Sequence, residues 1–384
     1  MLKYNNMFYE PVVILDQLTS EYSAEMSNDQ LAFLCGLIEE YRPNKIVEVG
    51  VSAGGTTAVI LKCISMLKLK PEFYSLDLST LFYRDQRKQT GYLAEECKKI
   101  LGSEVKHSLY TGKYAVEYLE EIGADIDFLI LDTVHSMPGE LLDFLAFYPY
   151  LKQSAIVVVH DIALNLFHNQ PDAFATKVLL DTVAARKFYG MDGDSLLNIG
   201  AFMINSDTGR YIDNIFSALT LTWKSFPKKE ELTLYREFYQ KHYNNGNLEL
   251  FDAAVRMNYR SREERLKEEK RKKKEELMRA YKWIEGIKQK DKVYIYGCGY
   301  YGKKLYELLD ALEICLGGFL VSDGQEKANM ENIYFISEVD VDTTREVILL
   351  GVDDSLYEDI GARLSERGIY DYVIPPRFIY SYLG

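Results

Sequence analysis

Basic residues are not in excess in this sequence. The 384 residues include 45 Lys and Arg against 58 Asp and Glu, which gives a formal net charge of −13 at pH 7. Proteins that bind nucleic acids usually present a basic surface to the phosphate backbone. We therefore expect no nucleic acid among the partners or substrates.

Cysteine pairs are also lacking. The five cysteines are far apart, and none belongs to a C-x-x-C motif of the kind that binds zinc or carries out redox chemistry: Cys35, Cys63, Cys97, Cys298 and Cys315. An odd number of separated thiols argues against a disulfide framework. We expect reduced thiols and a cytoplasmic protein.

Long apolar runs are absent as well. No run approaches the ~18 consecutive apolar residues of a membrane-spanning helix, and residues 1–6 lack the apolar core of a secretion signal. Neither membrane insertion nor export is expected. Apolar residues still make up 47% of the chain, and 384 residues are enough to build two hydrophobic cores.

Short apolar segments alternate with helical patterns in the first half of the chain. We predict strands over residues 45–49, 73–77, 105–110, 128–132 and 156–160, and a later antiparallel edge strand over 197–205. Helices are expected over 27–41 and 173–187. Strands that alternate with helices form a parallel sheet that is covered on both faces. The predicted fold class is therefore α/β, with a doubly wound, Rossmann-like sheet.

A glycine-rich turn follows the first of these strands. Residues 45–57 have the sequence KIVEVGVSAGGTT, in which Gly50 lets the chain turn sharply and Gly54 lets the backbone approach a ligand. The helix that follows offers unpaired N–H groups in its first turn. The glycine spacing differs from the G-x-G-x-x-G of dinucleotide sites. Glu48, two residues before the first glycine, needs a polar partner within an otherwise apolar strand.

This turn resembles motif I of the class I methyltransferases that use S-adenosylmethionine (SAM). In that family the turn passes under the methionine part of SAM, and an acid at the end of the second strand binds the ribose hydroxyls; Asp77 stands at that place. The family usually contacts the adenine after the third strand, where Thr111 and Gly112 stand. The resemblance therefore implies a set of cofactor-binding residues: Glu48, Gly50, Ser52, Gly54, Thr56, Asp77, Thr111, Gly112 and Asp132.

Two further motifs close the fourth and fifth predicted strands. The fourth strand ends in D-x-x-H, at Asp132 and His135, and the fifth ends in His160 and Asp161. This pair is similar to that of the small-molecule O-methyltransferases, a branch that includes cephalosporin hydroxylase-like and sugar-modifying members. The likeness covers roughly residues 40–205, with Thr and Ser in place of two glycines that are usual in the branch.

The carboxyl ends of parallel strands meet at one edge of a sheet, so these side chains should converge on one crevice. Methyl transfer to a hydroxyl needs a base for the hydroxyl proton and an in-line approach. His135 is the expected proton acceptor because an ordinary histidine titrates near pH 6.5. Asp132 and Asp161 are candidate ligands of a divalent cation such as Mg²⁺. We expect Asp132, His135 and His160 to be catalytic, with His160 a metal ligand, a base or an orienting group.

A purely structural role is the alternative for the same residues. Asp and His side chains at strand ends often cap a helix or satisfy the backbone of a loop. This alternative applies to His135 and His160, and also to His168. Both roles stay open at this point.

Charged residues dominate the segment after the predicted edge strand. We assign residues 1–205 to a SAM-dependent methyltransferase domain and residues 206–290 to a helical connector. The run at 262–276 has no apolar stripe, but it places opposite charges four residues apart, as in Glu263 with Lys267. A solvent-exposed helix is the expected structure. A homodimer contact through flanking apolar residues is the alternative.

A second glycine fingerprint begins the last part of the chain, residues 291–384. Gly297, Gly299 and Gly302 follow a predicted strand in the order G-x-G-x-x-G, and Asp323 ends the next strand about twenty residues later. The segment resembles the small Rossmann-like domain of the sugar O-acyltransferases of bacterial glycan pathways, which implies that it binds a nucleotide-sugar. NAD(P) binding and a domain that keeps only the fold are the alternatives.

We therefore predict a cytoplasmic, two-domain, SAM-dependent O-methyltransferase. The expected acceptor is a hydroxyl on a small molecule, in particular a sugar, a nucleotide-sugar or another glycan precursor, with metal assistance as an option. The alternatives are a non-catalytic, nucleotide-binding scaffold in glycan assembly and an NAD(P)-dependent oxidoreductase.

Overall fold

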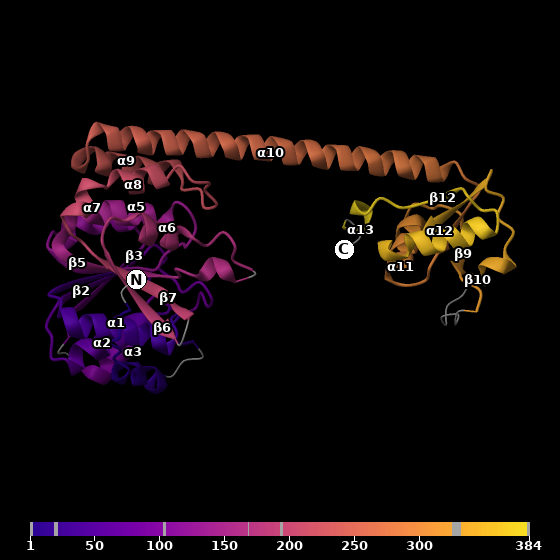
Figure 1. The fold of residues 1–384 in the computed structure, drawn as a ribbon. Coiled ribbons are helices and arrows are strands. Elements are labelled where there is room, and N and C mark those ends of the chain that lie inside the picture. The colour runs from indigo at the N-terminus through magenta and orange to yellow at the C-terminus, as the bar shows by residue number, and fades with distance from the viewer. Residues whose placement is uncertain are drawn as a thin grey trace. The chain divides into compact units, whose positions relative to one another are not determined.

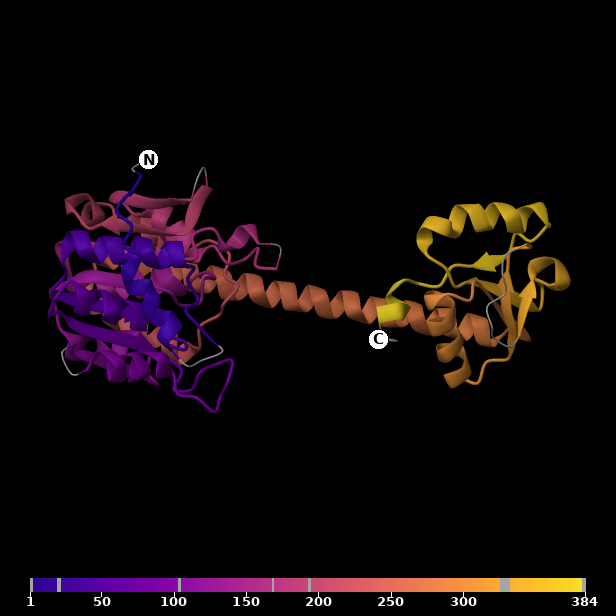
Figure 2. The same ribbon diagram turned by 90° about the horizontal axis from the view of Figure 1, so that it is seen from below.

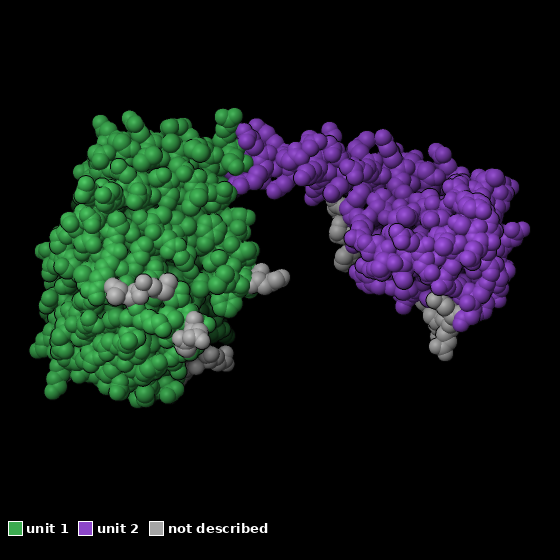
Figure 3. Space-filling model, viewed as in Figure 1, with its two compact units in different colours: residues 1–261 green, residues 262–384 purple. Residues whose placement is uncertain are grey.

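The computed structural model describes residues 3–18, 22–102, 105–167, 169–192, 195–324 and 332–381. The chain divides into two compact units, residues 1–261 (unit 1) and residues 262–384 (unit 2) (Figure 3).

Unit 1 is built on a seven-stranded sheet in the order β3-β2-β1-β4-β5-β7-β6. The strands are β1 (Lys45–Val49), β2 (Glu72–Asp77), β3 (His107–Thr111), β4 (Ile126–Leu131), β5 (Leu151–His160), β6 (Arg186–Asp192) and β7 (Ser195–Met203). Strands β1 to β5 are parallel, whereas β7 is antiparallel to both β5 and β6. This arrangement confirms the predicted α/β fold with its antiparallel edge.

Helices cover both faces of this sheet (Figure 1; Figure 2). On one face lie η1 (Glu10–Gln17), α1 (Asn28–Tyr41), α2 (Gly55–Met66) and α3 (Tyr92–Leu101). The other face is covered by α5 (Gly139–Phe147), α6 (Ala175–Thr182), α7 (Ser206–Arg210), α8 (Asp213–Ala218) and α9 (Lys229–His242). Short helical turns complete the unit: η2 (Ala115–Tyr118), α4 (Leu119–Ile122), η3 (Tyr148–Tyr150) and η4 (Leu164–Leu166).

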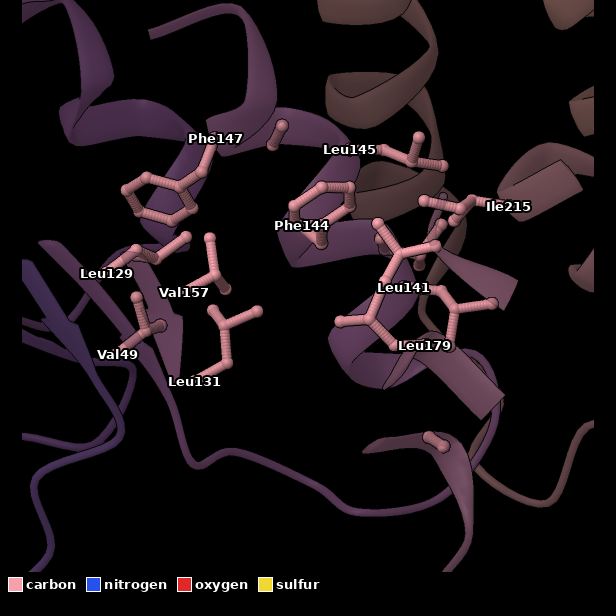
Figure 4. Packing of buried hydrophobic residues seen from close by; sticks show 14 of the residues in the cluster. Val49, Leu129, Leu131, Leu141, Phe144, Leu145, Phe147, Val157, Leu179 and Ile215 are labelled. Atoms are coloured by element: carbon pink, nitrogen blue, oxygen red, sulfur yellow. The ribbon is translucent and has the colours of Figure 1, made fainter. Parts of the chain in front are cut away.

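Alternate residues of the central strands enter two separate hydrophobic cores. Leu129 of β4 packs with Phe144 of α5 in one core (Figure 4), whereas Phe128, its neighbour in the strand, packs with α1 and α2 in the other. Successive side chains of a strand point to opposite faces. The nearly unbroken apolar sequence of β4 therefore follows from burial on both sides.

The predicted boundary between domain and connector, at residue 205, is wrong. Residues 206–261 pack on unit 1, and the side chains of Phe216, Trp223, Tyr239 and Phe251 are fully buried there. Only one face of α9 is apolar, so this segment has the composition of an exposed helix although it completes a core.

The edge of the sheet also differs from the prediction. The helix expected over 173–187 ends at Thr182 in α6, and the chain then forms β6, which was not predicted. Strand β6 pairs with β7 on the outside of the sheet, and its other edge makes only an isolated bridge, from Lys3 to Tyr189, within the described residues. Such an edge strand needs no continuous apolar sequence, so the pattern there is weak.

Unit 2 contains a five-stranded parallel sheet in the order β10-β9-β8-β11-β12. The strands are β8 (Lys292–Tyr296), β9 (Leu316–Val321), β10 (Ile333–Phe335), β11 (Glu346–Leu350) and β12 (Tyr372–Val373). The accompanying helices are α11 (Tyr300–Ala311), η5 (Ile336–Glu338), η6 (Asp354–Leu356), α12 (Tyr357–Glu366) and α13 (Phe378–Ser381). The second, smaller Rossmann-like sheet is thus confirmed.

One helix, α10 (Asn245–Lys288), belongs to both units. Its beginning contributes Phe251 and Ala254 to a core of unit 1, and its end contributes Ile287 to a core of unit 2. The charged run between them is largely exposed, as predicted. Within the described residues, no helix combines the length and apolar character that a membrane span requires.

Candidate active site

Close packing at the end of β1 explains the glycines of the turn. Gly50 has a φ of 95°, and a Cβ atom there would lie 1.8 Å from the carbonyl oxygen of Asp132. The Asp132 N–H donates to the carbonyl of Val49, so the ends of β1 and β4 are held together. Gly54, with a φ of 89°, is the N-cap of α2, and a Cβ there would lie 2.9 Å from the Cα of Gly91. Packing therefore requires glycine at both positions.

Asp77 ends β2 beside this turn. Its Oδ2 accepts hydrogen bonds from the N–H groups of Val51 and Ser52, both at 3.0 Å, and its Oδ1 accepts from the N–H of Ser79 at 2.8 Å. A carboxylate has room for about four such bonds. Asp77 can therefore fix the conformation of the turn and contact a ligand at the same time.

Glu48 lies inside the sheet rather than at its edge. The residue is 1% exposed, and its Oε2 accepts from Thr57 Oγ1 at 2.7 Å and from Ser75 Oγ at 2.6 Å. Ser75 Oγ is also hydrogen bonded to His107 Nε2 at 2.9 Å. Burial raises the pKa of Glu48 to about 7, although the hydrogen bonds from Ser75 and Thr57 act to lower it.

A cavity of about 870 Å³ lies over the carboxyl ends of β1, β2, β4 and β5. Five of the residues predicted to bind the cofactor line it: Gly50, Ser52, Thr56, Asp77 and Asp132. The remaining ones are not among its lining residues: Glu48, Gly54, Thr111 and Gly112. Beyond β3 the cavity wall is formed by Lys113 and Tyr114 instead. For these four residues that do not line the cavity, a direct contact with a cofactor stays a prediction.

His160 is held firmly at the end of β5. Its side chain is 4% exposed, with Nδ1 3.0 Å from Asp132 Oδ1 and Nε2 3.3 Å from Gln30 Oε1. Burial lowers the pKa of His160, but the charges and hydrogen bonds of Asp132 and Asp161 outweigh this effect and raise it to about 10. With both ring nitrogens donating, His160 orients its neighbours and has no lone pair to accept a proton.

His135 is the more accessible histidine of the cluster. Its side chain is 24% exposed, and its Nε2 lies 3.2 Å from Asp161 Oδ2. The backbone N–H of His135 donates to Glu140 Oε1 at 2.6 Å. Burial lowers the pKa of His135, but the carboxylates of Glu140, Asp132 and Asp161 together raise it to about 9. His168 lies outside the described residues.

The backbone at this site has an uncommon conformation. Ser52, His135 and Asp161 have φ values of 55°, 57° and 59°, in the left-handed region that residues other than glycine seldom occupy. Such residues gather at functional sites, where the surrounding structure maintains the strain.

Asp161 completes an Asp-His-Asp cluster. Ligand atoms of Asp132, His135 and Asp161 all lie within 4.8 Å of one another. Carboxylate oxygens with one imidazole nitrogen form a donor set that fits a divalent cation. The two predicted metal ligands, Asp132 and Asp161, are thus brought together, with His135 as the third donor. Asn198 Nδ2 donates to Asp161 Oδ1 at 2.5 Å and leaves Oδ2 directed at His135.

The far wall of the cavity comes from residues that the sequence analysis placed in the connector. Ser225, Phe226, Pro227, Lys228, Glu231 and Tyr235 line it. Tyr235 of α9 donates from its hydroxyl to Asp143 Oδ1 of α5 at 2.5 Å, across 92 positions of sequence. Burial raises the pKa of Asp143 to about 7. Both residues were missed because the contact depends on tertiary packing; the polar Asp143 within the apolar α5 was the available signal.

The predicted nucleotide residues of unit 2 have different surroundings. A Cβ at Gly302 would lie 2.0 Å from the carbonyl oxygen of Gly297, so packing requires that glycine, whereas a Cβ at Gly299 would meet no atom within 4 Å. Asp323 accepts from Ser337 Oγ at 2.7 Å and pairs with Arg367. The ligand that the resemblance implies for this unit stays a prediction.

A family model matches part of the first unit. Residues 47–162 match a family model described as a methyltransferase domain. Solved structures that resemble this chain include the O-methyltransferase TomG of Streptomyces achromogenes, involved in tomaymycin synthesis and in complex with SAM, at 15% identity and a TM-score of 0.36, over 54% of this chain and 92% of that one. No curated protein matches the chain.

Two further structures are similar to about half of the chain. One is an O-methyltransferase from Bacillus cereus in complex with S-adenosylhomocysteine (SAH), at 14% identity and a TM-score of 0.35, over 51% of this chain and 90% of that one. The other is the SAH-bound methyltransferase PaMTH1 of Podospora anserina, at 11% identity and a TM-score of 0.36, over 51% of this chain and 88% of that one. The segment matched by the family model holds the glycine turn, Asp77 and the Asp-His-Asp cluster, and the first unit therefore contains a methyltransferase domain.

Proposed function

We propose that unit 1 binds SAM and methylates a hydroxyl group on a small-molecule acceptor. The observation that carries this proposal is the shared cavity, because it is lined both by the glycine turn with Asp77 and by Asp132, His135 and Asp161. SAM supplies the methyl group on a sulfonium when it is bound. The residues of the chain bind it, orient the acceptor and accept the hydroxyl proton.

The turn and Asp77 are proposed to hold the cofactor. Asp77 retains acceptor capacity beyond its three backbone hydrogen bonds, which suits the hydroxyls of a ribose. Gly50, Ser52 and Thr56 line the same part of the cavity. Lys113 and Tyr114 line the cavity, whereas Thr111 and Gly112 do not, so the first two are available to contact the adenine of the cofactor.

The acceptor proton is proposed to pass to Nε2 of His135 in its neutral form, which becomes the main form as the pH rises through about 9, the pKa of His135. This atom lies among the cluster carboxylates, 3.2 Å from Asp161 Oδ2 and 3.9 Å from Asp132 Oδ1, and these charges stabilise the imidazolium that would form. As an alternative to proton acceptance by His135, Asp132, His135 and Asp161 would together hold Mg²⁺, which would lower the pKa of a bound hydroxyl. His160 is proposed to keep Asp132 oriented.

A sugar or glycan precursor is the proposed acceptor class. The far wall combines the polar side chains of Ser225, Lys228 and Glu231 with aromatic rings, a composition that suits a ring with several hydroxyls. In unit 2, the open space at Gly299 supports a nucleotide-sugar near the start of α11. A cytoplasmic location and a homodimer are further proposals.

Calorimetric titration of the full chain with SAH tests the cofactor proposal. We expect binding in the micromolar range and a loss of about 1–3 kcal/mol in Asp77→Ala, which removes charge-assisted hydrogen bonds. The matched control is Asp181→Ala, at an exposed ion pair with Lys177 on α6. No heat of binding with the wild-type chain would contradict the proposal. To test the transfer, the full chain is incubated with SAM and a mixture of sugars. Mass spectrometry then detects any sugar whose mass has increased by one methylene.

A further inference from the structure

Two acidic side chains in the far half of the cavity lack a positively charged ion-pair partner. Asp143 and Glu231 both line the cavity. In the described part of the chain no Lys, Arg or His side chain forms an ion pair with either of them, although Lys228 lies close enough to Glu231 to affect its titration. By contrast, Asp132 and Asp161 are balanced by two histidines.

The two carboxyls are fixed in place by neutral donors. Asp143 Oδ1 accepts from the Tyr235 hydroxyl at 2.5 Å, and Oδ2 accepts from Thr133 Oγ1 at 3.2 Å. Glu231 accepts from the N–H of Lys228 at 3.3 Å and from the side chain of Tyr114. Glu231 and Tyr235 are one helical turn apart on α9, so both side chains lie on the face that borders the cavity.

Burial without a counter-charge is unfavourable for a carboxylate. Asp143 is 8% exposed, and burial together with the nearby charges of Glu140 and Glu231 raises its pKa to about 7. Hydroxyl donors relieve this cost only in part, whereas a cation that entered the cavity would remove it.

We propose that Asp143 and Glu231 bind a protonated amino group of the acceptor, so that the substrate class is a hydroxylated amine such as an amino sugar. The inference rests on the proposed function of unit 1 and narrows its acceptor. The ammonium group would supply the missing positive charge, while the hydroxyl to be methylated lies at the Asp-His-Asp cluster of the same cavity. A neutral polyol would gain hydrogen bonds to the two acids but would form no ion pair with them.

Matched pairs of sugars test the charge requirement. The full chain is first saturated with SAH, and D-glucosamine, D-galactosamine, D-glucose and D-galactose are then titrated separately at about pH 7.5, which lies above the pKa of about 7 of Asp143 and below that of an ordinary α-amino group. Binding is followed by ligand-detected NMR. We expect each amino sugar to bind about 10-fold or more tightly than its hydroxyl counterpart, because only the ammonium group neutralises the charge of the acids.

Isosteric variants assign the effect to these residues. Asp143→Asn and Glu231→Gln should reduce the preference for the amino sugar to less than about threefold, because they remove the charge and keep the shape. Asp181→Asn and Glu95→Gln, two exposed ion-paired acids outside the cavity, should retain the preference. Where Asp143→Asn fails to fold, Glu231→Gln alone decides the assignment.

The outcomes separate the two proposals. Equal affinity for the paired sugars, or no binding of any of them, overturns the inference that the acceptor is an amine. If SAH still binds, the methyltransferase proposal is unaffected by that result. A preference that survives in both variants overturns the assignment to Asp143 and Glu231. Absence of SAH binding removes the proposed function and the inference with it.

Discussion

At the scale of single residues, the two histidines of the site share carboxylates but differ in access. The His160 side chain is 4% exposed and has both nitrogens engaged, whereas the His135 side chain is 24% exposed and faces the cavity. Both histidines line the cavity, but an acceptor hydroxyl would meet the more exposed His135 more readily than His160. The same carboxylate, Asp132, holds one histidine and lies near the other, so the two residues have distinct roles at one site.

Replacing His135 by glutamine tests its role as proton acceptor. We expect His135→Gln to lower turnover about 10²- to 10⁴-fold, because glutamine cannot take the proton, with SAH affinity unchanged. Steady-state kinetics and SAH titration measure the two effects. His242→Gln, at an exposed position on α9, is the control. Turnover equal to the wild type would assign the proton transfer elsewhere.

Glu48 makes the stability of unit 1 depend on pH. Burial raises the pKa of Glu48 from 4.5 in the unfolded state to about 7 in the folded state. As the pH rises, Glu48 therefore loses its proton at a lower pH in the unfolded state than in the folded state. The stabilising contribution is therefore complete below about pH 4.5 and is lost as the pH rises to about 7, by on the order of 3 kcal/mol.

The variant Glu48→Gln should remove this loss, so that its stability relative to the wild type increases from about pH 5 to pH 7.5. Urea unfolding followed by the fluorescence of Trp223, in a Trp283→Phe background, measures it. Glu95→Gln, which changes an exposed glutamate, should show no such trend. An identical pH dependence in Glu48→Gln and the wild type would refute the role of Glu48.

At the scale of elements, the sequence predicted every strand of the unit 1 sheet except β6. Strands β1, β2, β3, β4 and β7 lie within about two residues of the prediction, and β5 begins earlier than predicted, at Leu151 rather than Ile156, because burial on both faces demands apolar runs. The glycine turn and the strand ends at Asp132 and Asp161 were predicted from the same rule. Strand β6 was not predicted because its apolar stretch is short, and the packed role of α9 was not because only one face of that helix is apolar.

The site itself was predictable only where it lies at strand ends. Parallel topology brings Asp132, His135 and Asp161 together whatever the helices do. The contact of Gln30 with His160 spans 130 positions and that of Tyr235 with Asp143 spans 92. No local pattern encodes such contacts, since they arise from the way in which α1 and α9 pack on the sheet.

The helices after residue 205 should contribute strongly to the stability of unit 1. Trp223 is fully buried, and its ring N–H donates to the carbonyl of Leu219 at 2.7 Å. We expect Trp223→Ala to reduce the free energy of unfolding by about 3–5 kcal/mol, as for other large buried aromatic residues. Thermal unfolding monitored by circular dichroism measures this. Leu221→Ala, at a residue 44% exposed, should cost far less; a similar loss in both would contradict the burial of Trp223.

At the scale of the whole molecule, the two units have separate cores, and unit 1 needs the chain as far as residue 261. A truncation that ends at residue 274 should remain soluble and bind SAH, because every element of unit 1 is retained. A truncation at residue 205 should aggregate, since it exposes the apolar faces that α8 and α9 cover. Size-exclusion chromatography and SAH titration of both fragments check this. A soluble, SAH-binding fragment ending at 205 would show that the added helices are dispensable.

The contact between Gly50 and the Asp132 carbonyl has a consequence for genetics. Any side chain at position 50 would displace the backbone that carries Asp132, so a lesion in the turn also disturbs the chemical cluster. A screen of random mutants should therefore recover no allele at Gly50 that is defective in cofactor capture alone. Alleles at this position would behave as complete nulls, because cofactor binding and the chemical step would be lost together.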